Sequence, residues 1–424
     1  MNAQALTAFE HVAVPVDSAA GLGALSESEA DHLCALSEQL PSLCTRGYRS
    51  VKLAHYCGLV NLGSRVLEIL PKVGERDSAD ESRGVLLRLL HASRDFPLHH
   101  QPSAGQAHRS APLLEVFIRA FFDEVTRVLK GGLLRRYLEH EDDLLAVRGT
   151  VRVQRQFTAL ANRTDRIACR YDELTADNTW NRVLKAGLRI VRPWVTTHDL
   201  LRSWIELMAG FHEATDLPVA DVRSLLVDLR YDRQGNRYRP AIAWVERIVS
   251  LLSPDLRTGS KAAPGLLFDM NRLFEVAVEQ RMQTWAWHRR WIVEAQNSTQ
   301  YFTHIAGSPR RSAFKVRPDL LFSSRGQTMA VADAKWKRPA ISQHGFILPE
   351  QADLYQLHAY ASVFNCEQLA IIYPWTEGLS IARETTFELP SSVGLTPKVT
   401  TLFLDIGDDD LPLRLNTAFG VWVD

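Results

Sequence analysis

The sequence predicts a multidomain α+β protein, and three observations support this prediction. A chain of 424 residues is long enough for two or three domains, each with a core of its own. Residues 1–75 alternate short apolar runs with polar breaks, as small strands do, whereas residues 175–253 repeat apolar side chains at helical spacing. The segment Ser253–Gly265, rich in glycine, proline and serine, is the clearest linker in the chain.

These patterns divide the chain into three parts. We expect a small α+β or β-rich N-terminal domain over residues 1–160 and a mainly helical connecting region over residues 161–253. A C-terminal α/β domain is expected over residues 264–424, because strand-like and helical runs alternate there.

Apolar periodicity and capping residues place the elements of the first two parts. A helix over residues 27–39 is expected to start at a cap formed by Ser26 or Ser28. Further helices are predicted over residues 82–92, 113–138, 180–192, 200–212, 219–229 and 241–252. Residues 144–160 instead alternate apolar residues with arginine or glutamine, which indicates a strand. Its polar side, with Arg148, Arg152 and Arg155, is either a solvated face or a contact surface.

Composition limits the classes of function. Lysine plus arginine and aspartate plus glutamate number 49 each, so any contact with nucleic acid is local or assisted by another protein. Five cysteines without a Cys-x-x-Cys spacing argue against a disulfide framework or a zinc site and favour a reducing compartment. The start of the chain has no signal-peptide pattern and no apolar run approaches 18 residues, so we expect a cytoplasmic protein without membrane contact. His99, His100 and His108 share a polar loop, but their spacing fits no defined set of metal ligands.

The residues with the most chemical content lie in two apolar runs, 317–322 and 329–335, separated by a short polar linker. This pattern predicts an antiparallel hairpin. Asp319 and Asp333 are the same number of residues away from Gly326. A hairpin that closes there sets the two aspartates opposite each other, with their Cβ atoms about 4.5–5.5 Å apart.

Two carboxylates at this separation oppose each other's ionisation unless a cation lies between them, and their oxygens suit Mg²⁺ or, alternatively, Mn²⁺. Side chains alternate along a strand, so Lys335 projects from the same side as Asp333. A metal ion with a lysine beside it polarises a phosphodiester and activates a water molecule. The cluster therefore predicts hydrolysis of a nucleic-acid backbone.

An Asp-x-Lys triplet is also found as a solvated surface pair that contributes little. Asp333, however, lies in the run Met329–Ala334, which is otherwise apolar and in which an unpaired charge is costly. This setting favours the functional interpretation.

Two predicted helices flank the hairpin. The first carries an apolar stripe from Leu266 to Val278 with Glu275 at its edge, where this side chain either reaches a metal or is a surface glutamate. The second runs over residues 349–364, and its Gln356 and Tyr360 share a face because they are four residues apart. A strand over residues 368–374 follows.

This order of a helix with a glutamate, two strands with aspartates, a helix with Gln-x-x-x-Tyr and a further strand resembles the PD-(D/E)xK nuclease core, in particular its RecB-like branch. The wider chain is similar to the McrC family, the nuclease subunits of McrBC modification-dependent restriction systems, from about residue 50 to 375. The segments that carry this likeness are Leu67-Glu-Ile-Leu-Pro-Lys, Arg148-Gly, Arg170-Tyr-Asp-Glu-Leu-Thr-Ala-Asp-Asn, Asn181-Arg-Val-Leu-Lys-Ala, Met270-Asn-Arg-Leu-Phe-Glu and Asp353-Leu-Tyr-Gln-Leu-His-Ala-Tyr. The resemblance implies a PD-(D/E)xK restriction-endonuclease-like core in the C-terminal domain and a role in phage defence.

The resemblance also implies a role for each site residue. Asp319 and Asp333 would ligate Mg²⁺ with the Ala334 carbonyl as a third ligand, and Asp333 stands where many relatives have glutamate. Lys335 would act on the attacking water or on the charge of the transition state. The remaining side chains would complete the site, Glu275 as an outer or water-bridged ligand and Gln356 and Tyr360 as orienting groups. A basic rim would hold the backbone of double-stranded DNA, unless its charges are merely solvated: Arg310, Arg311, Lys315, Arg317, Lys337 and Arg338.

The family further implies a partner, a McrB-like AAA+ GTPase ring into which the N-terminal part docks and whose hydrolysis it stimulates. The chain itself has no Gly-x-x-x-x-Gly-Lys-Ser/Thr phosphate loop, which agrees with a motor on another chain. Two alternatives remain open at this point: a stand-alone RecB-like DNA repair nuclease, and a non-catalytic activator of an AAA+ ring.

Overall fold

The computed structural model describes residues 6–17, 23–38, 40–63, 65–72, 74, 78–93, 111–252, 265–287, 289–297, 300–304, 312–376, 379, 385–390, 396–408 and 413–414. The chain forms two compact units that are interleaved in sequence. Unit 1 comprises Met1–Ala5, Leu59–Val66 and Leu113–Leu266, and unit 2 comprises Leu6–Gly58, Leu67–Pro112 and Leu267–Asp424. The sequence-based domains were contiguous instead. Helices and sheets together confirm the α+β multidomain prediction.

The N-terminal part consists of small strands and one helix, as predicted. Strands β1 (Leu6–Phe9) and β6 (Val66–Leu70) pair in parallel within a sheet of order β1-β6-β5-β10, and β2 (Ala13–Pro15), β4 (Ser50–Leu53) and β3 (Cys44–Gly47) form a second sheet. The bounds of the other two strands are Tyr56–Asn61 for β5 and Gly265–Asp269 for β10. Helix α1 (Glu27–Leu36) starts at a capping box between Ser26 and Glu29, which confirms the cap predicted there.

A buried ion pair joins helix α2 (Ala79–Ala92) to strand β6. The Arg83 guanidinium donates from Nε to Glu68 Oε1 and from a terminal nitrogen to Glu68 Oε2, at 2.9 Å in both cases. Thr7 of β1 donates a further hydrogen bond to Glu68 at 3.0 Å. Both members of the ion pair are almost completely buried. Two parallel hydrogen bonds of this kind fix the position of the helix on the sheet.

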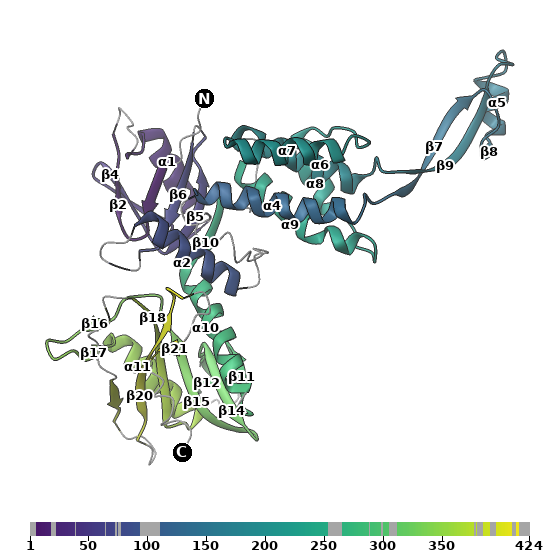
Figure 1. Cartoon of the computed structure of the whole chain (residues 1–424). Coiled ribbons are helices and arrows are strands. Elements are labelled where there is room, and N and C mark those ends of the chain that lie inside the picture. Colours follow the sequence, from purple (N-terminus) through teal and green to yellow (C-terminus); the bar gives the residue numbers. More distant parts are fainter. Residues whose placement is uncertain are drawn as a thin grey trace. The chain divides into compact units, whose positions relative to one another are not determined.

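The helices of unit 1 pack on one another (Figure 1) and confirm the helical region predicted from periodicity. They are α4 (Leu113–Lys130), α6 (Thr179–Val191), α7 (His198–Gly210), α8 (Val219–Asp228) and α9 (Arg239–Leu252), with the 3-10 turns Arg192–Trp194 and Gly235–Tyr238. The helix predicted to continue to residue 138 is shorter than expected. It ends at Lys130 because Gly131 and Gly132 follow, and Gly132 has a φ of 76°, the left-handed conformation that ends helices.

A long two-stranded arm extends from these helices (Figure 1). Strands β7 (Arg136–Leu144) and β9 (Ile167–Thr175) pair antiparallel over nine residues, and β8 (Thr150–Val151) pairs with β9 near the tip. The strand predicted over residues 144–160 was wrong. Its second half is the short helix α5 (Val153–Thr158). Before it, Gly149 has a φ of 69°, and a Cβ there would lie 2.3 Å from the Arg170 carbonyl oxygen, so the backbone passes β9 at a distance that favours glycine.

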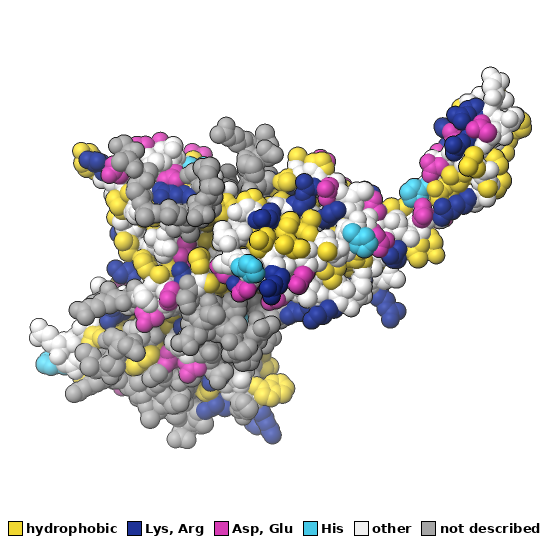
Figure 2. Space-filling view, turned by 45° about the horizontal axis from the view of Figure 1, so that its top comes forward, with side chains coloured by type: hydrophobic (Ala, Val, Ile, Leu, Met, Phe, Trp, Pro, Cys, Tyr) yellow, Lys and Arg dark blue, Asp and Glu magenta, His cyan; other side chains and the backbone are white. Residues whose placement is uncertain are grey.

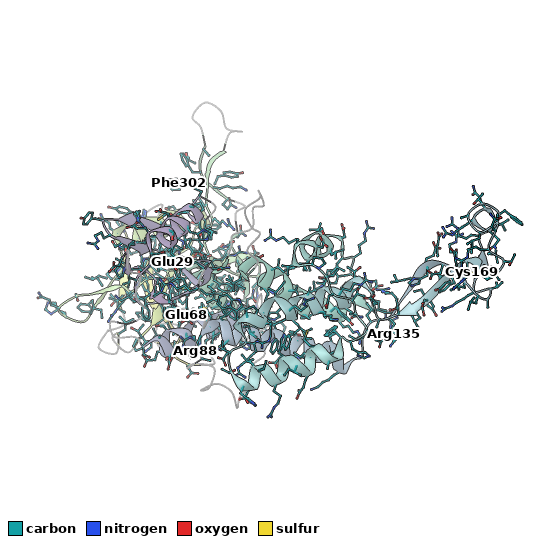
Figure 3. The ribbon with its side chains drawn as sticks, turned by 90° about the horizontal axis from the view of Figure 1, so that it is seen from above. Glu29, Glu68, Arg88, Arg135, Cys169 and Phe302 are labelled. Carbon is teal, nitrogen blue, oxygen red and sulfur yellow. The ribbon has the colours of Figure 1, made fainter. Side chains whose placement is uncertain are left out.

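A buried polar network holds the root of the arm. Leu134, two residues before β7, donates its backbone N–H to the Tyr238 hydroxyl at 2.7 Å, and its carbonyl accepts from the side-chain amides of Asn178 and Asn181. The Tyr238 hydroxyl in turn donates to Asn181 Oδ1 at 2.8 Å. Figure 3 shows Arg135 at this root and Cys169 toward the tip. Both backbone groups of one residue are therefore fixed where the strand leaves the helices.

A seven-stranded sheet forms the C-terminal part of unit 2, with the order β11-β14-β15-β18-β20-β19 and with β21 paired to β20. Its strands are β11 (Ile292–Ala295), β14 (Leu320–Ser324), β15 (Gln327–Ala334), β18 (Gln368–Trp375), β19 (Thr386–Glu388), β20 (Lys398–Asp405) and β21 (Leu413–Arg414). Strands β14 and β15 are antiparallel, whereas β15, β18 and β20 run parallel. Helix α11 (Gln351–Phe364) packs on β15 and β18 over a core that includes Leu357 and Ile371.

Helix α10 (Met270–Trp287) precedes this sheet in the chain and packs against β11 and β15. The helical stripe predicted from Leu266 starts later than expected, because residues 265–269 form strand β10. The Asp269 carboxylate then accepts from the backbone N–H of Asn271 at 2.9 Å, as helix-capping aspartates do.

Two short hairpins complete the described part of unit 2. They are β12 (Tyr301–His304) with β13 (Ser312–Lys315), and β16 (Ala340–Ile341) with β17 (Ile347–Leu348). Figure 3 shows Phe302 on the first of them, where the hairpin projects from the sheet. Among the described residues, no helix is both long and apolar enough to cross a membrane.

Candidate functional site

The hairpin β14–β15 sets the two aspartates opposite each other, as predicted. It closes at Arg325 and Gly326, whose φ values of 50° and 79° match the tight two-residue turn that joins antiparallel strands. A bulge between Phe322 and Ser323 then shifts the pairing by one residue, and Leu320 pairs with Ala332. Because Asp319 comes just before Leu320, the same register brings it opposite Asp333. Without the bulge, these side chains would lie on opposite faces.

The two carboxyl groups lie close enough at the end of β15 for the charge of Asp333 to act on Asp319. Asp333 is only 2% exposed, and Asp319 Oδ2 accepts the backbone N–H of Ala334 at 2.8 Å. Burial, followed by the charge of Asp333, raises the pKa of Asp319 to about 8. The pair therefore favours a bound proton or cation over two free negative charges at neutral pH.

Lys335 lies beside this pair and forms an ion pair with Asp333. Burial lowers the pKa of the Lys335 ammonium, but the charges of Asp333 and Asp319 outweigh this effect and raise the pKa above its ordinary value. The lysine is therefore fully protonated at neutral pH, as a positive charge that faces two acidic groups.

Helix α11 orients this lysine through a chain of hydrogen bonds. Lys335 Nζ donates to Gln356 Oε1 at 3.2 Å, and Gln356 Nε2 donates to the Tyr360 hydroxyl at 2.6 Å. Tyr360 donates in turn to the Arg317 backbone carbonyl at 3.1 Å. The amide oxygen of Gln356 accepts from Lys335 and its amide nitrogen donates to Tyr360, so these hydrogen bonds allow only one orientation of the amide. The two residues that the sequence placed on one helix face do lie at the site.

Glu275 of α10 lies on another side of the same cluster. Burial, with the charge of Asp333 as a further cause, raises the pKa of Glu275. Gln296, directly after β11, donates from Nε2 to Glu275 Oε2 at 3.1 Å and from its backbone N–H to the Asp319 carbonyl at 2.9 Å. The Arg317 guanidinium donates to Gln296 Oε1. Sequence reasoning missed Gln296, because a single glutamine at the end of a short strand carries no motif.

The donor set suits a small divalent cation. Within the described part of the chain, no three or more histidine, cysteine, aspartate or glutamate side chains gather in a group that could hold a metal ion. Two carboxylates do meet at Asp319 and Asp333, next to the backbone of Ala334. Mg²⁺ binds through one or two carboxylates and keeps several waters, so this pair is enough for it. Burial and the charge of Asp333 both raise the pKa of Asp319, and a cation between the two carboxylates would favour their ionised forms.

The predicted basic rim is only partly available to a ligand. Lys315 is exposed on β13, and Arg317 is exposed but donates to Gln296. Lys337 forms ion pairs of 2.8 Å with Glu350 and with Asp353 of α11. Arg338 is exposed. Two further arginines of the predicted rim, Arg310 and Arg311, lie outside the described residues.

The arginines predicted on residues 144–160 pair with acidic residues of the arm itself. Arg155 contacts Asp143 at 3.0 Å, Arg148 contacts Glu173 at 3.6 Å and lies over the Tyr171 ring, and Arg152 pairs with Glu141. These pairs favour the solvated-face alternative. The three-histidine loop at residues 99–108 lies outside the described residues.

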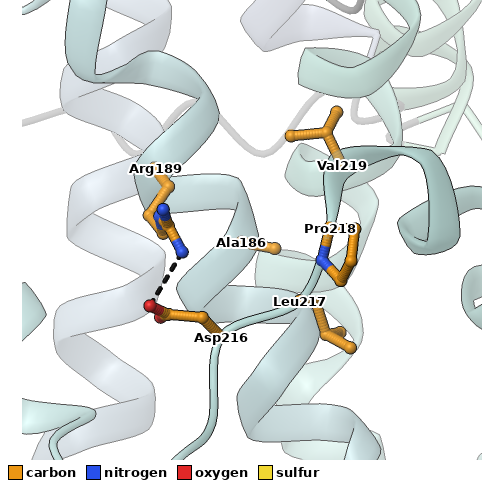
Figure 4. Close-up of a pocket in the computed structure, with 6 residues that line it drawn as sticks. All are labelled: Ala186, Arg189, Asp216, Leu217, Pro218 and Val219. Atoms are coloured by element: carbon orange, nitrogen blue, oxygen red, sulfur yellow. Dashed lines mark ion pairs between the residues drawn. The ribbon is translucent and has the colours of Figure 1, made fainter.

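A pocket of about 450 Å³ lies in unit 1, beside helices α6 and α8 (Figure 4). Its polar groups include the ion pair between Arg189 and Asp216, at 2.8 Å. Leu217, Pro218 and Val219 contribute apolar walls. The aspartate pair, in contrast, belongs to unit 2. The pocket brings together no carboxylate pair and no nucleophile, so we assign the chemistry to the aspartate cluster.

Comparisons with known proteins agree with the likeness seen in the sequence. The chain is similar to a Thermococcus gammatolerans structure of McrB AAA+ hexamers with bound McrC, at 18% identity and a TM-score of 0.75 over 98% of each chain. A cryo-EM structure of the McrBC complex of the same organism matches at 20% identity and a TM-score of 0.51, over 66% of this chain and 87% of the other. No curated protein matches. The family described as McrBC 5-methylcytosine restriction system component matches residues 51–374, so the chain belongs to the McrBC family.

Proposed function

We propose that the chain is the Mg²⁺-dependent DNA endonuclease subunit of a McrBC-like modification-dependent restriction system. The observation that carries this proposal is the pair Asp319 and Asp333 with Lys335 beside it, at the end of two paired strands. The order α10, β11, β14, β15, α11, β18 supports a PD-(D/E)xK core, which requires a helix, three strands, a helix and a strand. Membership in the restriction family supports DNA as the substrate.

In this proposal, Asp319, Asp333 and the Ala334 carbonyl hold the metal. When bound, Mg²⁺ supplies a Lewis acid that polarises the phosphodiester and lowers the pKa of a nearby water. Lys335 offers a protonated donor to the phosphoryl oxygens, where negative charge develops in the transition state. Gln356 keeps that ammonium in place, because its amide oxygen accepts from Nζ.

Substitution of Asp333 by Ala tests this proposal. The variant is expected to lose DNA cleavage by more than about 100-fold, because one of the two metal-holding carboxylates is gone. Asp405→Asn is a matched control, since Asp405 is a buried aspartate at the end of β20, a parallel strand of the same sheet that is separated from β15 by β18. The proposal requires full cleavage by the control and unchanged stimulation of the partner GTPase by both variants. Retained cleavage by Asp333→Ala would refute it, and cleavage by wild-type chain without any NTPase would favour the stand-alone repair nuclease.

We also propose that the arm docks onto a McrB-like AAA+ GTPase ring and stimulates it. In the structural relatives, McrC is bound to McrB hexamers. The arm exposes an unusual number of large apolar side chains: Tyr137, Leu145, Val147, Val153, Phe157 and Leu174. Figure 2 shows hydrophobic side chains of the arm interleaved with acidic and basic ones. An apolar surface with charges between it is typical of a site that another protein covers.

A double variant of the arm tests this docking role. Phe157→Ala with Leu145→Ala removes two side chains that are 76% and 75% exposed, so little stability is lost. GTPase stimulation is expected to fall by about 10-fold or more, as for truncated anchor residues of an interface. The control is Val227→Ala, because Val227 is an apolar residue of α8 that is 86% exposed. Equal stimulation by the double variant and the control would contradict docking through the arm.

A further inference from the structure

The first strand of the chain ends in a carboxyl group that reaches the segment after the catalytic lysine. Glu10 directly follows β1 and is 1% exposed. Its Oε1 accepts two hydrogen bonds of 3.0 Å, one from the backbone N–H of Lys72 and one from the indole N–H of Trp336. Glu10 and Trp336 are 326 residues apart in sequence. All three residues belong to unit 2.

Trp336 occupies a critical position in the proposed site. It follows Lys335 directly, and its ring packs on Phe274, the residue before Glu275, with 5.4 Å between the ring centroids. The indole is 8% exposed. Trp336 is therefore linked to two proposed site residues. It is bonded to Lys335 through the backbone, and it packs on Phe274, which precedes Glu275.

Two backbone hydrogen bonds shape the chain at this point. Strand β15 ends at Ala334, and the next residue is tied to the sheet by Lys335 N–H donating to the Ile372 carbonyl at 2.9 Å. Lys337 then donates its N–H to the Lys335 carbonyl at 2.9 Å, which turns the chain away from the sheet. Between these two hydrogen bonds, the buried side chain of Trp336 points into the core, and its only polar atom donates to Glu10.

We propose that Glu10 is a positioning residue for the nuclease site, which acts by holding Trp336 and thereby the backbone of Lys335 and the packing beside Glu275. This inference rests on the proposed nuclease function. Glu10 does not touch the reacting groups itself. Its contribution is the placement of the lysine, and misplacement of a reacting group by about 1 Å can lower a rate by about 100-fold.

Glu10 holds Trp336 through its Oε1 atom as a hydrogen-bond acceptor, and this contact does not require a negative charge on the carboxyl group. Burial raises the pKa of Glu10 to about 7, and the Cys57 thiol lies beside the carboxyl. Both the neutral acid and the carboxylate offer Oε1 to the indole. A glutamine has the same length and offers a carbonyl oxygen at the same place, so Glu10→Gln preserves the contact that an alanine removes.

The test compares three variants of the full chain in complex with its AAA+ partner, by single-turnover cleavage of DNA at saturating Mg²⁺. Glu10→Ala and Trp336→Phe are each expected to cut roughly 10- to 100-fold more slowly. Glu10→Gln is expected to cut within about 3-fold of wild type, since the acceptor remains. DNA affinity and GTPase stimulation should be unchanged in all three. The double variant Glu10→Ala/Trp336→Phe should be no slower than either single variant, because both remove the same contact.

Glu68→Ala is the matched control for loss of stability, because Glu68 is equally buried in the neighbouring strand β6 but contacts Arg83 instead of the site. The inference is overturned if wild type cuts DNA and Trp336→Phe cuts at the same rate. The cleavage rate of each variant is divided by its folded fraction. The inference is also overturned if this corrected rate falls as much in Glu68→Ala as in Glu10→Ala. If wild type with its partner cuts no DNA, the proposed function itself fails, which is a different outcome from either of these.

Discussion

The burial of Glu10 predicts a pH dependence of folding that one substitution removes. In the unfolded chain, the Glu10 carboxyl has its ordinary pKa of 4.5, whereas burial raises it to about 7 in the folded protein. A raised carboxyl pKa means that folding favours the neutral form. The contribution of Glu10 is therefore most favourable below pH 4.5 and is lost as the pH rises through 7.

The difference between these two pKa values sets the size of the effect. A shift of about 2.5 units corresponds to about 3 kcal/mol in total, since each unit is worth 1.36 kcal/mol. Between pH 5.5 and pH 8, about 2 kcal/mol of this falls within a range where most other carboxylates stay ionised. Wild type should lose that amount of unfolding free energy relative to Glu10→Gln, which has no proton to exchange.

Urea unfolding of both chains at pH 5.5, 6.5, 7.5 and 8 measures this difference. Neighbouring His11 is present in both chains, and burial is the chief cause that lowers its pKa. Because His11 Nε2 lies 4.0 Å from Glu10 Oε2, His11→Asn is introduced into both chains so that this histidine does not contribute. The difference between the chains should grow mainly between pH 5.5 and about 7 and then level off toward pH 8. Parallel pH profiles for wild type and Glu10→Gln would refute the assignment of a buried, partly protonated carboxyl at this position.

Three further predictions concern other buried networks. Arg83→Ala leaves the buried Glu68 carboxylate without its main partner and should lower the unfolding free energy by about 3–5 kcal/mol, measured by urea unfolding; a loss below about 1 kcal/mol would contradict a closed ion pair. Asn181→Ala removes three hydrogen bonds at the arm root and should cost about 3 kcal/mol and speed hydrogen exchange at the start of β7, whereas unchanged exchange would show that the root is held otherwise. Tyr360→Phe frees the Gln356 amide and should slow DNA cleavage by about 10-fold with unchanged DNA affinity; a change in affinity alone would instead place Tyr360 on the DNA.

The sequence was sufficient to place the main site residues because their spacing is tied to regular geometry. Asp319 and Asp333 face each other because a hairpin repeats every two residues, and Gln356 meets Tyr360 because a helix repeats every 3.6. The register was right even though the turn lies at Arg325 and Gly326, since a bulge compensates the shift. The periodicity of the sequence predicts neither the position of the turn nor the bulge, because both depend on backbone φ values.

Other features depend on contacts between distant residues and leave no local pattern. Gln296 joins Glu275 and Arg317, and Glu10 joins Trp336, through single hydrogen bonds across the fold. The strand predicted over residues 144–160 failed for a related reason. Its alternation of arginine and apolar residues fits the short helix α5 as well as it fits a strand. The arginines at and within this helix pair with acidic residues of β7, a contact that the local sequence does not reveal.

The hydrogen bonds around Leu134 fix one end of the arm to the helices, whereas its other end has no such support among the described residues. Nine paired residues give the β7–β9 ladder a length of about 30 Å, and a rotation of about 5° at the root moves the far end by about 3 Å. Both backbone groups of Leu134 are hydrogen-bonded, so the chain cannot rotate freely where the arm begins. A force on the far end of the arm is therefore transmitted to α6 and Tyr238. A partner that grips the tip would therefore turn the helices at the root together with the arm.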